Sequence, residues 1–213
     1  MIRIFIESGV NQAEKSGKET TDEKDFVEKF IQHHFPKYKL SEDYEVFGTG
    51  GKDKLHKFQT KLQENTFNGG TNLVIYDADG SNNGGGFSKR LSHYNAQKVS
   101  LNIDFDLFLW PNNHSDGDFE TMLMQITLPK HKGLIDCFNQ YARRIKRMSR
   151  GKIKYNVPGR KGCIHSYISA MPMKRKEKEL FSKGYWAFDN KEYWNLDAEY
   201  LQPLKEFLEQ YFV

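Results

Sequence analysis

The stretch NLVIYDADGSNNGGG, residues 72–86, decides the fold of this chain. It begins as an apolar run and ends on two carboxylates, Asp77 and Asp79, before a series of glycines and asparagines. A short apolar run bounded by such residues is typical of a buried strand. Acidic side chains at the end of a buried strand are costly unless something compensates for their charge. The stretch therefore predicts a buried strand whose carboxyl end requires a partner.

Other short apolar runs, typical of buried strands, occur on both sides of this stretch, and they alternate with amphipathic segments that are typical of helices. Because the strands are almost continuously apolar, the sequence predicts an α/β fold, with a parallel four-stranded sheet and helices on both of its faces. A polar loop is expected over residues 8–24. The predicted strands span residues 2–7, 44–51, 72–77 and 105–111, and the predicted helices span about 22–35, 52–65 and 87–97.

The pattern becomes less regular after Pro111. Helices are predicted over 116–126 and 131–148, the second with an apolar face that runs from Leu134 to Ile145 and includes Tyr141. The segment 149–162 is expected to be a loop or an edge strand. A closing helix is predicted over 198–212, with Pro203 in its first turn or at a kink. We expect a single domain over 1–213, with a core over about 1–127 and a helical, basic elaboration over about 128–213.

The 213 residues carry a net charge of only +4, which permits a nucleic-acid partner without requiring one. The charge is unevenly distributed, because no acidic residue falls between Cys137 and Lys176 while many lysines and arginines do. Neither a signal peptide nor an apolar run of about 20 residues is recognisable. The two cysteines form no metal-type spacing. We therefore expect a cytoplasmic protein without a membrane partner.

The strand ends bring acidic residues together. Glu7 ends the first predicted strand and Asp77 the third, and parallel strands place these ends at one edge of the sheet. Residues two apart in extended chain share a face, so Asp79 is expected to lie beside Asp77. One acid after a strand is more often a turn-former or helix cap. Three acids on one edge favour a Mg²⁺ or Mn²⁺ site with oxygen ligands.

The glycines after the second strand have two interpretations. Gly50, Gly51 and Lys52 stand before a predicted helix, at the same edge as the acids. The spacing is not that of a Walker phosphate loop, and Asp53 occupies the position where that motif has a hydroxyl. Backbone N–H groups at a helix start favour a bound anion. A tight turn that requires glycine accounts for the same residues equally well.

These residues together resemble a Toprim domain. A glutamate ends the first strand, a glycine turn follows the second, and an Asp-x-Asp ends the third. The stretches FLWPNN, GDFETML and WNLDAEYLQPLKEFL are similar to the small stand-alone bacterial Toprim-like proteins of the DUF3226 group. The same module occurs in topoisomerases, primases and overcoming-lysogenization-defect nucleases. The resemblance covers most of the chain through short motifs.

The resemblance implies roles for particular residues. It makes Glu7 the general acid or base, Asp77 and Asp79 the magnesium ligands, and Glu120 an additional acid near the metal. It also places a phosphate-binding glycine at Gly50 or Gly51. The 213 residues depart from the larger relatives, because we recognise in them no ATPase segment, no nucleophilic-tyrosine domain and no zinc-type cysteine spacing. The resemblance thus supports a metal-dependent phosphoryl site without selecting one of those reactions.

Basic residues suggest how a nucleic acid would be held. Arg143, Arg147 and Arg150 recur near the helical period and could form one stripe that binds phosphates. The alternative is that this stripe is the solvated face of an amphipathic helix. Nucleic acid is the partner that we expect, while a homodimer or another protein partner stays open. The adjacent His33 and His34 are not expected to share a face of their helix, so they suggest no site.

Three functions are compatible with these observations. The first is a Mg²⁺-dependent, nuclease-like phosphoryl-transfer enzyme that acts on nucleic-acid phosphodiesters. The second is a non-catalytic Toprim-like module that binds a nucleotide or a partner. The third is a haloacid dehalogenase-like phosphatase with Asp77 as the nucleophile, although that motif belongs on a first strand. For Glu120, a role in capping the helix that follows Asp116 and Asp118 competes with metal ligation.

Overall fold

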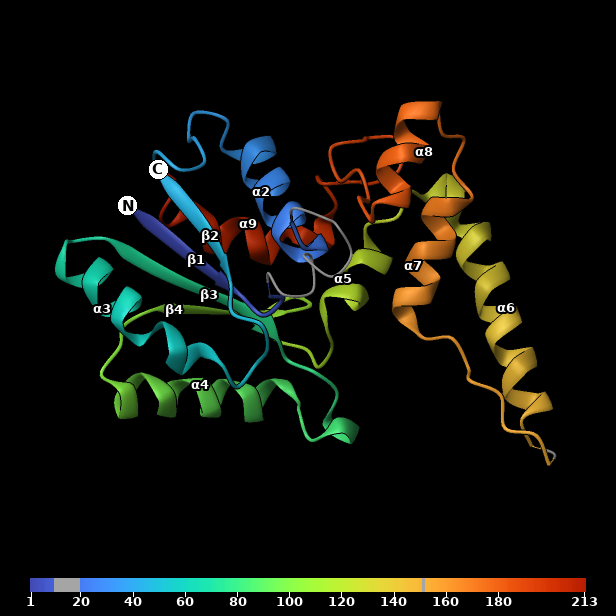
Figure 1. Ribbon diagram of the computed structural model, residues 1–213, viewed down its shortest axis with the longest axis horizontal. Helices are drawn as coiled ribbons and strands as arrows, with labels where there is room; N and C mark the ends of the chain where they lie inside the picture. Colours follow the sequence, from blue (N-terminus) through green and yellow to red (C-terminus); the bar gives the residue numbers. More distant parts are fainter. Residues whose placement is uncertain (10–19, 151) are drawn as a thin grey trace.

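A computed structural model describes residues 1–9, 20–150 and 152–213. Its centre is one parallel sheet with the strand order β2-β1-β3-β4 (Figure 1). The strands are β1 (Ile2–Ile6), β2 (Tyr44–Gly48), β3 (Thr71–Asp77) and β4 (Asp106–Trp110). The chain moves outward from β1 to β2 and then returns to the other side of β1. The switch point of the topology therefore lies between β1 and β3, where such sheets build their sites.

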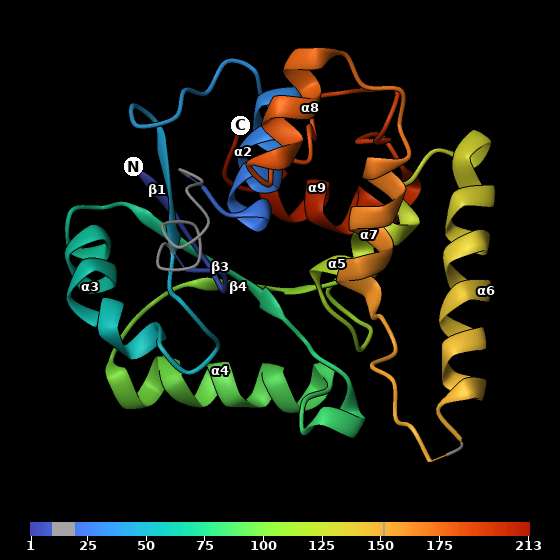
Figure 2. The ribbon, with the colours of Figure 1, turned by 45° about the vertical axis from the view of Figure 1, so that its right-hand side comes forward.

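Helices cover both faces of the sheet, as the continuous apolar strands predicted. In Figures 1 and 2, α2 and α9 lie on one face and α3 and α4 on the other. Successive strand residues enter opposite layers: Ile4 and Ile6 pack in the core beside α2 and α9, and Phe5 packs in the core beside α3 and α4. The predicted α/β fold with a parallel four-stranded sheet is confirmed.

The helices predicted over about 22–35 and 87–97 begin where expected, whereas the one predicted over 52–65 becomes an α-helix only at Gln59, after a 3₁₀ turn at Leu55–Phe58. Thr21 caps α2 by accepting the N–H of Lys24, and Pro203 lies in the first turn of the closing helix. Of the loop predicted over 8–24, residues 10–19 lie outside the described residues. The α-helices are α2 (Asp22–His34), α3 (Gln59–Phe67), α4 (Phe87–Leu101), α5 (Phe119–Gln125), α6 (Lys132–Met148), α7 (Arg160–Ser169), α8 (Arg175–Ser182) and α9 (Gln202–Glu209).

The segment after α5 differs from the sequence-based expectation. No residue of α6 is fully buried, and Tyr141, expected to face inward, is 57% exposed. The helix packs beside α7 at the side of the molecule away from α3 (Figures 1 and 2). Residues 152–159 form no edge strand. Helices α7 and α8 were not predicted. Helix α7 places Ile164, Tyr167 and Ile168 in the core, but its apolar residues form no clear amphipathic stripe in the sequence.

The core on the α2 side depends on a cluster of aromatic rings. Phe26 is fully buried, and its ring lies within 5.9 Å, between centroids, of the rings of Phe30, Trp110, Phe119 and Phe188. These rings join α2 to β4, to α5 and to the segment before α9. Edge-on and offset ring contacts of this kind stabilise beyond the area that they bury.

We predict that Phe26→Ala lowers the free energy of unfolding by about 3–5 kcal/mol, because it removes a buried ring and leaves a cavity. Urea denaturation followed by circular dichroism measures this. The matched control is Phe67→Ala, at the end of α3, where the side chain is 91% exposed. That change should stay within about 0.5 kcal/mol. Equal losses in the two variants would contradict the assigned core.

Candidate functional site

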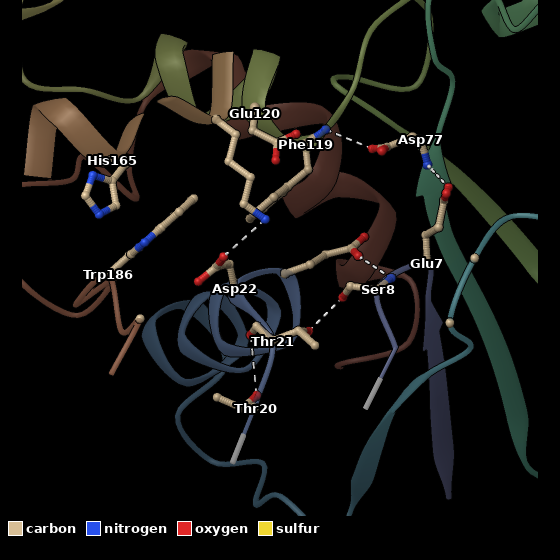
Figure 3. A pocket seen from close by; sticks show the side chains of 15 residues that line it. Glu7, Ser8, Thr20, Thr21, Asp22, Asp77, Phe119, Glu120, His165 and Trp186 are labelled. Carbon is tan, nitrogen blue, oxygen red and sulfur yellow. Dashed lines mark hydrogen bonds and ion pairs between the residues drawn. The ribbon is translucent and has the colours of Figure 1, made fainter. Parts of the chain in front are cut away.

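Glu7 and Asp77 are neighbours at the carboxyl end of the sheet. Ile6 of β1 pairs with Ile75 of β3, which brings the next residues of both strands to the switch point. The backbone N–H of Asp77 donates to Oε2 of Glu7 at 3.4 Å. The Asp77 side chain points towards α5, where its Oδ1 accepts the N–H of Phe119 at 2.8 Å (Figure 3). The topology thus brings together two of the three acids that the sequence placed at this edge.

These two acids line a cleft of about 470 Å³ with further acidic residues. Figure 3 shows Glu120 projecting from the start of α5 above the cleft, opposite the first turn of α2. Lys161 and His165 of α7, together with Trp186, line the side away from the sheet. The acidic residues that line the cleft are Glu7, Asp22, Glu23, Asp77 and Glu120.

Glu23 is a site residue that the sequence analysis did not identify. Its side chain is buried and receives two hydrogen bonds of 2.9 Å each, from the backbone N–H of Ser8 and from Nε1 of Trp110. An acid in the first turn of a helix is ordinarily explained by the helix dipole. Its spacing carried a further signal, because Glu23 precedes Phe26 and Val27 by three and four residues. It therefore lies on the buried face of α2.

Burial and mutual repulsion raise the pKa values of the carboxyl groups in this cleft. Desolvation is the largest cause for each, so the neutral form is favoured. The pKa of Glu7 is raised further by Asp79, and that of Asp77 is raised further by Glu23 and Glu7. Burial raises the pKa of Glu23 to about 7. Among the described residues, no salt bridge joins Glu7, Glu23, Asp77 or Glu120 to a cation.

Asp79 does not share this environment. Its backbone has a φ of 59°, so the extended chain ends before it and the expected common face with Asp77 is lost. Its carboxylate forms an ion pair with the buried Arg90 and lies 3.7 Å from Nζ of Lys52. It lines a second, smaller depression of about 300 Å³, which Glu7 and Lys52 also line. Glu7 therefore stands between an acidic cleft and a depression where cations neutralise the acid.

The acids of the loop before α5 have separate roles. Asp118 is the N-cap of α5 and accepts the N–H of Thr121 at 2.9 Å, and Arg160 forms an ion pair with it. Asp116 accepts the N–H of Phe87 at the start of α4. Glu120 neither caps α5 nor contacts the start of α4, and it lines the cleft instead. Of the two roles weighed for Glu120, capping therefore belongs to Asp118.

The glycine turn is built for a close approach of backbone segments. Gly50 and Gly51 have φ values of 82° and 134°, which side chains rarely tolerate. A Cβ atom on Gly9 would lie 2.3 Å from Cα of Gly50, and the N–H of Gly51 donates to the carbonyl of Glu7 at 2.8 Å. Only a short 3₁₀ turn follows, at Leu55–Phe58, before α3 begins. The turn thus holds the Glu7 backbone in place, and Lys52 is engaged with Asp79.

The arginine stripe lies apart from the acidic cleft. Arg143 and Arg147 are exposed on α6, and Arg150 follows the end of that helix. Arg143 and Arg147 line a surface depression of about 650 Å³ with Tyr141 and Cys137, and no acidic residue is among the described residues that line it. The stripe and the cleft are linked through α7, which packs on α6 and presents Lys161 to the cleft.

The oxygen-only donor set at Glu7 and Asp77 fits a hard divalent cation such as Mg²⁺. Among the described residues, one oxygen of each carboxyl group receives a backbone N–H, and no hydrogen bond is seen to Glu7 Oε1 or Asp77 Oδ2. Asp79 fits less well, because Arg90 holds it. In the described part of the chain, no three ligand atoms from these acids lie within 4.8 Å of one another. A cation here would therefore be held by few protein ligands and several waters, as Mg²⁺ commonly is.

Comparison with known proteins gives one match. Residues 18–213 match a family model that is described as a protein of unknown function, DUF3226. Neither the curated proteins nor the solved structures contain a match. Within the described residues, no helix is long and apolar enough to cross a membrane.

We predict that stability falls as the pH rises through the range in which Glu23 ionises. The folded pKa of about 7 exceeds the ordinary value of 4.5, so the folded state holds its proton where the unfolded state has lost it. In buffer with a chelator, the free energy of unfolding should drop by on the order of 3 kcal/mol between about pH 5 and pH 8. Urea denaturation across this range measures the slope.

Glu23→Gln should flatten that slope. The amide opposes one of the two N–H donors, so this variant should be less stable than the wild type near pH 5, where Glu23 is protonated, and the slope is the informative quantity. Glu64→Gln, an exposed position on α3, should keep the wild-type slope. An unchanged slope in Glu23→Gln would contradict the assignment of Glu23 as a titrating group of the cleft.

Proposed function

The chain belongs to the DUF3226 family of proteins of unknown function, and on that premise we propose that it is a Toprim-like, Mg²⁺-dependent phosphoryl-transfer enzyme acting on nucleic-acid phosphodiesters. The observation that carries the proposal is the cleft in which several carboxyl groups have raised pKa values and no salt bridge to a cation within the described chain. A divalent ion would offset that repulsion. When bound, it would polarise a phosphodiester and stabilise charge on the leaving oxygen.

Glu7 is the residue best suited to move a proton. It lies between the acidic cleft and the depression that contains Lys52 and Asp79. Its raised pKa brings it closer to the range in which an acid–base group works at neutral pH. Asp77 is held by the N–H of Phe119 at one oxygen, which fixes the direction of the other. We assign Glu7 as general acid or base and Asp77 as the principal metal ligand.

Cations near the cleft would bind the substrate phosphate. Lys161 lines the cleft and lies 4.0 Å from Asp22, and Arg160 is paired with Asp118 beside it. Glu120 lines the cleft with Asp77 and Lys161, where it can hold water or a second cation. Asp79 can join the metal only after its ion pair with Arg90 opens. While this ion pair is intact, Asp79 positions Arg90 and Lys52 beside Glu7.

The test is cleavage of single- and double-stranded DNA and RNA by the purified protein with Mg²⁺ or Mn²⁺. We predict metal-dependent cleavage, with losses of at least about 100-fold in Asp77→Asn and Glu7→Gln. Glu64→Gln, which changes the same chemical group on the exposed side of α3, should retain full activity. Cleavage that persists in Asp77→Asn, or that proceeds without a divalent ion, would contradict the proposal.

The ion pair of Asp79 favours a second candidate, a non-catalytic module that binds a nucleotide or a partner. Arg90 and Lys52 already satisfy an acid that the resemblance assigns to the metal. Saturable binding of Mg²⁺ and a nucleotide without any cleavage would select this candidate. Asp77→Asn should then weaken binding of the metal. Absence of both cleavage and metal binding would contradict the enzyme and leave the second candidate, as a module that binds a partner.

The proposal also assigns Arg143, Arg147 and Arg150 to the phosphate backbone. We predict that replacing all three with alanine weakens nucleic-acid binding and reduces its salt dependence by about 0.9 in the logarithmic slope for each phosphate that is no longer neutralised. Fluorescence anisotropy at several salt concentrations measures this. Replacing Lys57, Lys89 and Lys176, three exposed cations on other elements, removes the same charge and serves as the control. Equal effects of both sets would contradict a defined binding stripe.

A further inference from the structure

Two adjacent histidines at the end of α2 converge on one carboxylate from the far end of the chain. Nε2 of His33 lies 2.8 Å from Oδ1 of Asp197, and Nε2 of His34 lies 4.0 Å from the same atom. Within the described residues, these three form the one group of histidine, cysteine or acidic ligand atoms that all lie within 4.8 Å of one another. The expectation that the two histidines do not share a face of their helix is therefore wrong, because both Nε2 atoms approach the same carboxylate oxygen.

We propose that His33, His34 and Asp197 form a binding site for a first-row transition-metal ion such as Zn²⁺, separate from the acidic cleft. Two imidazoles and one carboxylate are a donor set for Zn²⁺ and its neighbours rather than for Mg²⁺. Bonds of about 2.0–2.2 Å at tetrahedral angles place ligand atoms about 3.3–3.6 Å apart. The two histidine–Asp197 separations, 2.8 and 4.0 Å, lie on either side of that range, and all three ligand atoms lie within 4.8 Å of one another. Rotations of the side chains would bring them to the ion.

The surroundings of the three side chains also suit a cation. The histidines form the last turn of α2, where the carbonyl end of the helix dipole attracts positive charge. Nε2 of His34 donates to the carbonyl oxygen of Leu196 at 3.0 Å, so this oxygen lies beside the site and could bind the ion once the proton has moved to Nδ1. A cavity of about 410 Å³ opens beside His33, Leu196 and Asp197 and leaves room for water on the ion.

The tautomer of His34 must change when an ion binds. A carbonyl oxygen only accepts, so Nε2 of His34 carries the proton that it donates to Leu196 in the free protein. An ion at Nε2 therefore requires the neutral tautomer that is protonated at Nδ1. Lys205 acts electrostatically on His34 and Lys191 acts on Asp197, and both lysines oppose the binding of a further cation. We therefore expect micromolar affinity rather than the tighter binding of a zinc finger.

A bound ion would connect two parts of the chain that are distant in sequence, the end of α2 and the segment before α9. The site joins the carboxyl end of α2 to the segment that leads into α9, and the other end of α2 carries Thr21, Asp22 and Glu23 to the acidic cleft. A bound ion would thus fix the helix that forms one side of the cleft. It contributes no group to the cleft itself, so this site does not depend on the proposed activity.

The test is calorimetric titration of the full chain with Zn²⁺ in buffer that contains excess Mg²⁺, together with the melting temperature with and without Zn²⁺. We expect one ion per chain and a higher melting temperature. His33→Gln and Asp197→Asn should weaken the affinity by at least about tenfold and abolish the shift in melting temperature. His56→Gln, an exposed histidine before α3, should behave like the wild type, and so should Asp77→Asn in the cleft.

Chemical shifts of the imidazole nitrogens identify the ligands directly. Zn²⁺ should shift Nε2 of both His33 and His34 in ¹⁵N spectra and leave His56 unchanged. His33→Gln and Asp197→Asn alter exposed or half-buried side chains, so both should fold, and circular dichroism checks this. Binding that persists unchanged in either variant, or the absence of saturable Zn²⁺ binding in the wild type, would overturn the proposal and leave an ordinary hydrogen-bonded cluster.

Discussion

Repulsion between buried carboxyl groups at the switch point of the sheet is the constraint on which the rest of the site depends. The parallel topology places the ends of β1 and β3 side by side, so Glu7 and Asp77 cannot separate without breaking the sheet. Glu23 approaches from α2, where Ser8 and Trp110 hold it. Each group responds with a raised pKa, because desolvation and the neighbouring acids disfavour its charge. A fold that retains such a cluster pays for it in stability, which is a common feature of functional sites.

The two acids of the Asp-x-Asp illustrate how local backbone geometry divides one motif between two environments. Asp77 ends the extended strand and lines the acidic cleft, whereas Asp79 lies in the left-handed region and meets Arg90 and Lys52. Glu7 lines both the acidic cleft and the smaller depression that contains Asp79 and Lys52. One side of Glu7 therefore faces the carboxyl groups of the cleft, whose pKa values are raised, and the other faces an acid that Arg90 and Lys52 already neutralise.

The sheet and its helices were predictable because hydrophobic periodicity reports burial directly. The apolar run before Asp77 and the glycines after Gly48 were sufficient to place the carboxyl ends of two strands at one edge. Glu23 was missed because a first-turn acid has an ordinary explanation, although its spacing to Phe26 indicated burial. The ion pair of Asp79 depends on one positive φ value, and the meeting of His33 with Asp197 depends on a contact 164 residues apart in the chain. Neither leaves a local pattern in the sequence.

The most direct test of the central claim is a crystal structure of the protein with Mn²⁺, with the ion located by its anomalous scattering. Our account predicts an anomalous peak within about 2.0–2.4 Å of a carboxylate oxygen of Asp77, with Glu7 facing the same ion directly or through water. A crystal grown in saturating Mn²⁺ that shows no anomalous peak in the cleft would contradict it.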